Sequence, residues 1–341
     1  MVAHVKSTDF HHLDQVARVL NAASRIVTIT GAGISTGAGI SDFRSESSTY
    51  TRGDRDLLRF SSLQNDRLKS DLYRLLHRAR SIATAAKPTT THHFIRELHH
   101  SELLIRNYTQ NIDGLEQKAG LNNDKNVQLH GSLWSLRCMV CNHTTPWAYD
   151  DQAILKERSE KCCPRCLRRS RERVERGKRA TGVGMLRSNV VLYDEVDQHG
   201  NHFAETINED LGGIPEIVLI MGTSLKTHGI QELVRDFAEV AHQRHGTVIF
   251  VNRSQPTTNW DGILDYWVQW DCDPWVQDLG QRGYQPARRS TDRICQVGRT
   301  GNLTGSCRTP STPAGEIGTR HNPIDLTSGE WDSPIDLTAV G

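Results

Sequence analysis

Short blocks of consecutive apolar residues alternate along this chain with segments in which apolar residues recur every three or four positions. The blocks are typical of strands buried on both faces, and the recurring positions predict amphipathic helices. The predicted strands are residues 26–30, 103–108, 189–193, 217–221 and 247–251, and the predicted helices are residues 13–23, 57–86, 91–99 and 230–245. Strands that alternate with helices form parallel crossovers, so the pattern predicts an α/β fold with an open, doubly wound (Rossmann-like), mostly parallel sheet.

The alternation is interrupted between about residues 138 and 184, where cysteines and arginines replace the apolar blocks. We expect a small module there, inserted between the two parts of the sheet domain, residues 1–137 and 185–280. Residues 281–341 are rich in Gly, Ser, Thr, Pro and Arg and poor in large apolar side chains, which predicts a disordered tail. This tail carries the sequence Pro-Ile-Asp-Leu-Thr twice.

Composition narrows the class of protein. With 341 residues, of which 36% are hydrophobic, the chain can bury a sizeable core, and its net charge of +1 gives no overall attraction to nucleic acid or membranes. No apolar block approaches the roughly 18 residues that a membrane span needs, and the first residues lack the pattern of a signal peptide. We therefore expect an intracellular protein with no membrane partner, in which the eight cysteines are more often metal ligands or thiols than disulfides.

Four of the cysteines form two C-x-x-C pairs inside the inserted module, at a spacing close to that of a zinc ribbon. They are Cys138, Cys141, Cys163 and Cys166. Four thiolates saturate a tetrahedral Zn²⁺ ion, so the predicted zinc is structural and leaves no position open for substrate. Cys162 is an alternative ligand in the second pair, and buried free thiols are the alternative for all four.

A glycine-rich turn follows the first predicted strand and predicts a nucleotide site, because small residues let the backbone approach a pyrophosphate. The residues concerned are Gly31, Ala32, Gly33 and Ile34, followed by Asp42, Phe43 and Arg44. The glycine spacing is one residue longer than the usual dinucleotide fingerprint, and no acidic residue ends a second strand about 20 residues later. The pattern therefore disfavours an ordinary dehydrogenase, and a plain glycine turn is the alternative.

Polar side chains also follow the later strands. Gln110, Asn111, Ile112 and Asp113 come directly after residues 103–108, where they can read a carboxamide and ribose hydroxyls or form an Asn/Asp-rich turn. His130 follows a short apolar strand and is a candidate general base, although it is one of sixteen histidines. Gly222, Thr223, Ser224, Asn252, Arg253 and Cys272 follow the last strands and would face the same crevice.

Taken in order, the segments GAGIS, DFR, TQNIDGLE, HG, the paired C-x-x-C, GTSL and VN resemble the sirtuins, the NAD-dependent protein-lysine deacylases, from about Leu13 to Leu279. Residues 178–195 and the segment GTSLKTHG further resemble the fungal nuclear Hst-type branch, which acts on acetylated histone H3. The resemblance implies a nuclear enzyme of chromatin silencing and transcription regulation. It would deacetylate a histone lysine with NAD and give nicotinamide and O-acetyl-ADP-ribose.

The resemblance also implies roles for individual residues. His130 would be the catalytic base beside Asn111, and the glycine turn, Asp42–Arg44, Gln110–Asp113 and the residues after the last strands would bind NAD. The substrate peptide would add a strand to Val190, Val191, Leu192, Tyr193 and Glu195. Ser41 and Asp194 replace a Pro and a Gly that are usual in the family, which leaves loop closure and peptide preference open.

Other interpretations stay open. A catalytically weak NAD-binding module that recruits chromatin partners is one alternative function, and a mono-ADP-ribosyltransferase is another. The arginine-rich run from Arg165 to Arg179 can contact DNA, act as a nuclear-import signal, or be a solvated face. Each Pro-Ile-Asp-Leu-Thr copy resembles a segment that adds a strand to a small ubiquitin-like modifier and also a corepressor-docking peptide; chance similarity is the remaining alternative.

Overall fold

The computed structural model describes residues 2–41, 51–147, 161–195, 200–256 and 260–286. Seven strands form its large sheet: β1 (Ala3–Lys6), β2 (Ile26–Thr30), β3 (Leu104–Thr109), β4 (Asn126–Gln128), β9 (Ile217–Met221), β10 (Thr247–Val251) and β11 (Tyr266–Gln269). Their order is β1-β11-β10-β9-β2-β3-β4, and every neighbouring pair is parallel. The predicted doubly wound α/β fold is confirmed. The strand order reverses between β2 and β9, where such sheets bind ligands.

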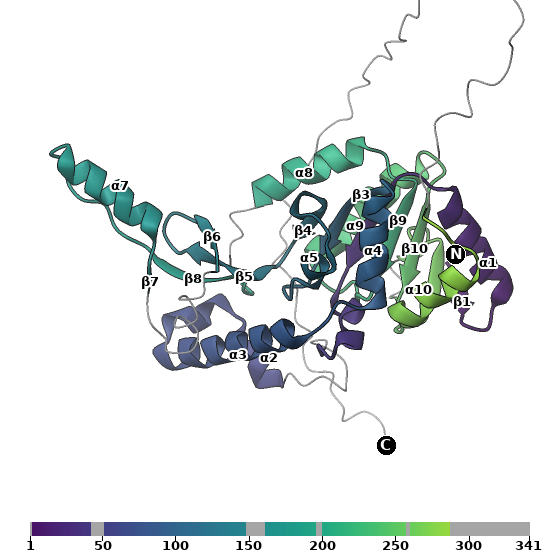
Figure 1. The fold of residues 1–341 in the computed structure, drawn as a ribbon, viewed down its shortest axis with the longest axis horizontal. Helices are drawn as coiled ribbons and strands as arrows, with labels where there is room; N and C mark the ends of the chain where they lie inside the picture. Colours follow the sequence, from purple (N-terminus) through teal and green to yellow (C-terminus); the bar gives the residue numbers. More distant parts are fainter. Residues whose placement is uncertain (1, 42–50, 148–160, 196–199, 257–259, 287–341) are drawn as a thin grey trace, which may run out of the picture.

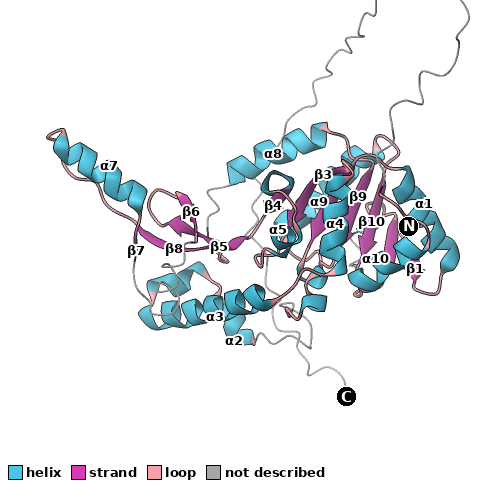
Figure 2. Ribbon diagram, in the orientation of Figure 1, coloured by secondary structure: helices cyan, strands magenta, loops and turns pink. Residues whose placement is uncertain are grey.

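Helices cover both faces of this sheet (Figures 1 and 2). α1 (Phe10–Ala22), α4 (Thr90–His100) and α10 (Cys272–Gln281) pack on one face, and α8 (Gly200–Gly212) and α9 (His228–His242) pack on the other. In α1 the buried residues are Leu13, Val16, Ala17 and Leu20, as its apolar spacing predicts. No helix in the described part of the chain is both long enough and apolar enough to cross a membrane.

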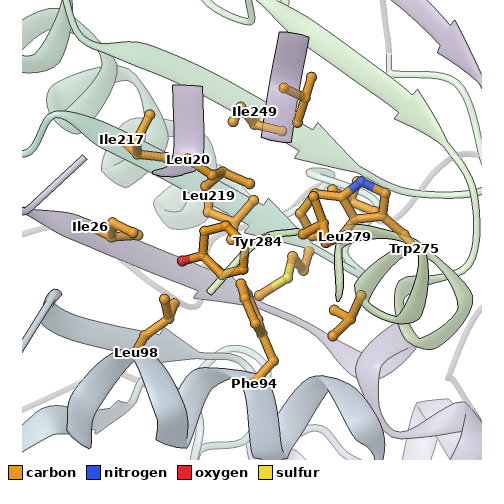
Figure 3. Packing of buried hydrophobic residues seen from close by; sticks show 14 of the residues in the cluster. Leu20, Ile26, Phe94, Leu98, Ile217, Leu219, Ile249, Trp275, Leu279 and Tyr284 are labelled. Carbon is orange, nitrogen blue, oxygen red and sulfur yellow. The ribbon is translucent and has the colours of Figure 1, made fainter. Parts of the chain in front are cut away.

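Aromatic rings close the core under α4 and α10 (Figure 3). The ring of Phe94 packs edge-on against Trp275, with centroids 6.4 Å apart, and tilts against Tyr284 at 5.8 Å. Such pairs contribute about 0.5–1.5 kcal/mol beyond the area that they bury. They fix the start of α10, and therefore Cys272, against the ends of the strands.

A second, smaller sheet lies beside the first and is antiparallel. It consists of β5 (Gly131–Cys138), β6 (Thr144–Pro146), β7 (Lys161–Cys162) and β8 (Met185–Val190), in the order β6-β5-β8-β7. The predicted strand at residues 189–193 is therefore wrong in extent and in sheet. The strand runs from Met185 to Val190 and pairs with β5, because the apolar run after Val190 leaves the ladder to pack against a group of helices.

These helices are α2 (Arg52–Leu57), the 3-10 helix η3 (Phe60–Gln64) and α3 (Asp66–Ala85). The side chain of Asn65 accepts hydrogen bonds from the backbone N–H groups of Arg67 and Leu68, which starts α3. The apolar face of α3 packs onto Leu133, Val190 and Leu192. The helices and the small sheet thus enclose one side of the segment that follows β8.

α7 (Pro164–Glu175) begins at the second cysteine pair and extends away from both sheets, at the far left of Figure 1. Only Cys166 of this helix is buried. The remaining short elements are η1 (Ala32–Ile34), η2 (Thr36–Ala38), α5 (Leu115–Ala119) and η4 (Asn123–Lys125). Both Pro-Ile-Asp-Leu-Thr copies lie outside the described residues.

Candidate active site

A pocket of about 260 Å³ lies at the carboxyl ends of the large sheet, where the strand order reverses. Loops after β2, β9, β10 and β11 line it, and the residues include Gly33, Gly222, Asn252, Arg253 and Cys272. The sequence predicts all five at a nucleotide site, and the structure brings them together. Asp42, Phe43 and Arg44 lie outside the described residues.

The turn after β2 lies so close to the turn after β9 that two of its positions must be glycine. The backbone N–H of Gly33 donates to the carbonyl of Gly222 over 2.8 Å, and a Cβ on Gly33 would lie 2.6 Å from Gly222 Cα. A Cβ on Gly31 would lie 2.8 Å from the Gly222 carbonyl oxygen. Glycine at both positions therefore lets the turn after β2 lie directly against the turn after β9, and Gly33 also lines the pocket. Ile34 is buried in the core, and Ala32 is half-buried beside it.

Asn111 and Asp113 are held by Ser35, which lies in the first turn. The Asn111 side-chain amide donates to the Gly31 carbonyl over 3.1 Å and to Ser35 Oγ over 3.3 Å, while Ser35 Oγ donates to Asp113 Oδ2 over 2.8 Å. The Leu115 N–H donates to the other Asp113 oxygen over 2.9 Å. Burial raises the pKa of Asp113. These bonds tie the end of β2 to the end of β3.

Ser35 is not among the residues that the sequence predicts at the site. The available signal was its position inside the glycine-rich turn, directly after Ile34. Its burial among polar partners is a tertiary feature that the apolar pattern does not report. Ile112 is half-buried and packs against the cluster formed by α3 and β5.

His130 lies in the two-residue connection between β4 and β5. Its Nδ1 is 3.1 Å from the carbonyl oxygen of Gln110. A carbonyl only accepts hydrogen bonds, so Nδ1 carries the hydrogen and the lone pair of the neutral ring is on Nε2. The Gln110 side chain donates to Thr223 Oγ1 over 2.7 Å, which connects this group to the turn after β9.

The segment from Val190 to Glu195 runs past His130. The Val191 N–H donates to the His130 carbonyl over 3.0 Å, and Tyr193 exchanges backbone hydrogen bonds of 2.8 Å with Leu58 and Phe60. A second pocket, of about 220 Å³, borders this segment. It is lined by residues that include Gln128, Ser132, Asn189, Val191 and Phe203.

Glu195 is buried, and its carboxylate fixes the backbone path of the segment Val190–Glu195. The guanidinium groups of Arg137 and Arg187 both contact its Oε1, and the Leu192 N–H donates to its Oε2 over 3.0 Å. The carboxylate therefore bends the chain back onto β5 and β8. Asp194 is exposed and left-handed, with φ of 62°, which explains why glycine suits this position.

The remaining predicted residues form the far end of the first pocket. Gly222 has a φ of 65°, and Thr223 is buried beside it, whereas Ser224 and Arg253 are exposed. The Asn252 side chain donates to the Ser254 carbonyl over 3.1 Å. Cys272 is buried at the start of α10, and burial raises the pKa of its thiol, so it is a neutral wall of the pocket rather than a nucleophile.

The four predicted zinc ligands come together between the small sheet and α7. Their sulfur atoms all lie within 4.8 Å of one another, and the Cys138–Cys166 and Cys141–Cys163 sulfur distances are both 3.7 Å. Zn–S bonds of about 2.3 Å in a tetrahedron give sulfur separations of about 3.8 Å, so this cage fits zinc. Cys162 is exposed and points to Met185 instead.

Comparison with known proteins identifies the fold and the family. Residues 31–229 match the sequence profile of the Sir2 family. The chain belongs to the Sir2 family. It is 36% identical over 312 residues to NAD-dependent histone deacetylase HST3 of Saccharomyces cerevisiae, with 82% of this chain and 70% of that protein covered. It is 34% identical over 285 residues to NAD-dependent histone deacetylase HST4 of the same yeast, with 77% and 76% covered.

Solved Sir2 structures share the fold. A Sir2 homolog–NAD complex superposes with a TM-score of 0.62 at 21% identity, covering 82% of this chain and 96% of the other. A Sir2 protein with a deacetylated p53 peptide and 3′-O-acetyl ADP-ribose gives 0.61 at 22% identity, covering 80% and 98%. The sirtuin resemblance of the sequence is therefore confirmed.

Proposed function

We propose that this Sir2-family chain is an NAD-dependent protein-lysine deacetylase that acts on acetylated histone in the nucleus. The observation that carries the proposal is that hydrogen bonds tie Asn111, Asp113, Gln110 and His130 to the turns after β2 and β9, and these two turns line the first pocket. The names of the yeast relatives support the activity and the substrate class.

Bound NAD would supply the ribose that accepts the acetyl group and the nicotinamide that leaves. The turns at Gly222, Asn252 and Cys272 would hold the adenosine end, because they line the pocket. Asn111 and Asp113 would hold the nicotinamide, and Gln110 the adjoining ribose. His130 Nε2 would take a proton from a ribose hydroxyl, since its Nδ1–H is already committed to the Gln110 carbonyl.

The segment Val190–Glu195 would bind the acetylated peptide by strand addition. It is fixed at one end by the bond from Val191 to His130 and at the other by the backbone pair of Tyr193 with Leu58 and Phe60. Because these bonds already fix the segment, it would lose little further conformational entropy when the peptide binds. Cys138, Cys141, Cys163 and Cys166 would hold one structural Zn²⁺ that anchors this module.

The projecting helix α7 would contact DNA. Its arginines at positions 165, 168, 169 and 171 are exposed, as is Arg176 directly after the helix, and Arg168 forms a weak 4.0 Å ion pair with Glu172. Phosphate contacts of this kind weaken steeply with salt. Replacing Arg168, Arg169 and Arg171 by Gln should reduce duplex-DNA binding and its salt dependence, with peptide deacetylation unchanged; unaltered DNA binding would reject this role.

One assay separates the functional alternatives. The chain is incubated with NAD and acetylated histone H3 peptide, and nicotinamide, deacetylated peptide and O-acetyl-ADP-ribose are quantified, with His130→Ala as the control. Equal amounts of the three products support the deacetylase. Binding of NAD without turnover would favour the recruitment module, and label from NAD on a protein acceptor would favour ADP-ribosyl transfer.

A further inference from the structure

A buried polar cluster lies directly behind the proposed nicotinamide pocket. His92 of α4, Asp113 of the loop after β3 and Glu116 of α5 have ligand-type atoms within 4.8 Å of one another. His92 and Glu116 are each 1% exposed. Within the described part of the chain, neither Glu116 oxygen nor His92 Nε2 has a hydrogen-bond partner at ordinary distance. Nothing in the proposed reaction uses Glu116 or His92.

The hydrogen on His92 can be located. The backbone N–H of Thr89 donates to His92 Nδ1 over 3.2 Å, so Nδ1 is an acceptor. Thr89 Oγ1 also lies 2.9 Å from Nδ1, and its own hydrogen is directed to the Ile34 carbonyl over 3.0 Å. Burial lowers the pKa of His92 to about 4, so the ring is neutral and carries its hydrogen on Nε2, inside the cluster.

The positions of the hydrogen-bond donors also indicate which of the two carboxyl groups, Asp113 or Glu116, carries a proton. Both oxygens of Asp113 accept a hydrogen bond, one from Ser35 Oγ and one from the Leu115 N–H, which stabilises its ionised form. Neither oxygen of Glu116 has a hydrogen-bond partner at ordinary distance among the described residues, and the opposing influence of the Thr109 side chain is smaller than that of burial. Two carboxylates this close in a buried site do not both ionise, so the proton resides on Glu116.

The titratable groups that face Glu116 support this assignment. Burial and the nearby Asp113 raise the pKa of Glu116 to about 8, with the Thr109 side chain at the end of β3 acting in the opposite direction. His92, from α4, is neutral. In a metal site His92 would have to offer the lone pair of Nε2, but that nitrogen carries the hydrogen while Nδ1 accepts from Thr89.

We propose that Glu116 is a positioning residue that works as a neutral carboxylic acid. Its O–H donates to the Asp113 carboxylate, and the Nε2–H of His92 lies within 4.8 Å of this pair without a hydrogen bond to it. Glu116 thereby supports the Asp113 carboxylate, which accepts the hydrogen bond of Ser35, and Ser35 in turn accepts that of Asn111. The inference rests on the proposed function, because it assigns Asp113 and Asn111 to the nicotinamide pocket.

The test compares Glu116→Gln, which keeps a carbonyl acceptor and replaces the O–H by an N–H donor, with Glu116→Leu, which removes both. Glu239→Gln, at an exposed position of α9, is the matched control. We expect Glu116→Gln to keep KM for NAD and the nicotinamide inhibition constant within about threefold of the parent chain. We expect Glu116→Leu to raise both about tenfold or more, with a smaller change in kcat. Equal loss in both variants would show that a negative charge is needed, and would overturn the proposal.

A second measurement does not depend on folding of the leucine variant or on activity. The infrared spectrum of the parent chain at neutral pH should contain the carbonyl stretch of a protonated carboxylic acid, and Glu116→Gln should remove it. A parent spectrum without that band would overturn the proposal, as would metal analysis that finds a second bound ion lost in Glu116→Leu. Absence of deacetylation in the parent chain and all variants, with the band present, would reject the proposed function and leave the protonated acid standing.

Discussion

The imidazole of His130 is fixed by the carbonyl of Gln110, which accepts a hydrogen bond from Nδ1 over 3.1 Å. Because Gln110 directly follows β3 and His130 follows β4, two neighbouring strands of the large sheet set the orientation of the ring. The bond also selects the tautomer whose Nε2 can accept a proton.

Replacing His130 by Ala should lower the steady-state rate of nicotinamide release from NAD and acetylated peptide by about 10²–10⁴-fold, because the proposed general base is lost. The ring is half-buried, and the backbone bond from Val191 does not require it, so the melting temperature should change little. Steady-state kinetics and thermal unfolding check the two parts. A variant with full deacetylation activity would remove His130 from the reaction.

The exposed Asp194 and Arg59 form an ion pair of 2.7 Å beside the proposed peptide segment. Asp194→Asn tolerates the left-handed backbone and removes the charge, whereas Asp194→Gly relieves about 1 kcal/mol of backbone strain as well. Because the lost ion pair is exposed and weak, the glycine variant should be as stable as the parent or slightly more stable.

Both variants should raise KM for lysine- and arginine-rich acetylated peptides by a few-fold at low salt, and high salt should abolish the difference. Peptide titrations at two ionic strengths measure the effect. A rise in KM that persists at high salt would show that Asp194 acts through backbone shape rather than charge.

Stability should depend on pH through Glu116 and His92. Between pH 6.5 and about 8 the folded chain keeps a proton on Glu116 that the unfolded chain has lost, since the pKa of Glu116 is raised from 4.5 to about 8. The free energy of unfolding should therefore fall as pH rises through this window, by up to about 1.4 kcal/mol per unit. Below pH 6.5 His92, with its pKa lowered to about 4, has the opposite effect, because the unfolded chain gains the proton.

Glu116→Gln should remove the fall in the free energy of unfolding that Glu116 causes between pH 6.5 and 8. Below pH 6.5 the variant should show the loss of stability on acidification that His92 causes. Denaturant unfolding at a series of pH values gives the slopes. Parallel slopes in the parent chain and the variant would contradict the buried acid.

The zinc cage gives a prediction that distinguishes neighbouring cysteines. Cys163→Ser should lose the bound metal and unfold the small sheet, because the cage would lack one of its four sulfurs. Cys162→Ser should keep one metal ion per chain, since its exposed sulfur points to Met185. Metal analysis and thermal unfolding test both variants, and metal loss from Cys162→Ser would reassign the ligand set.

The sequence predicts the large sheet well for a simple physical reason. β2, β9 and β10 are buried on both faces, so each is a continuous apolar block whose limits the chain itself displays. The carboxyl ends of such strands meet at one edge, which is why polar residues as distant as Asn111 and Asn252 can be assigned to a single crevice.

The parts that sequence analysis missed are those that carry little apolar signal. α7 buries only Cys166, so no periodicity marks it as a helix. In β5 and β8, Arg137 and Arg187 are buried around Glu195. In a sequence alone, charged residues such as these indicate an exposed surface rather than a buried strand. Ser35, His92 and Glu116 were missed for the same reason, because their burial depends on partners that only the fold brings together.

His130 occupies the joint between the two sheets. Its ring is oriented by Gln110 of the large sheet, while its own carbonyl receives Val191 from the end of β8 in the small one. The next residue, Gly131, allows no side chain, because a Cβ there would lie 1.9 Å from the Asn189 carbonyl. A tilt of the small sheet would therefore change the orientation of the imidazole, so that a peptide bound at the proposed segment would also affect the position of the proposed base.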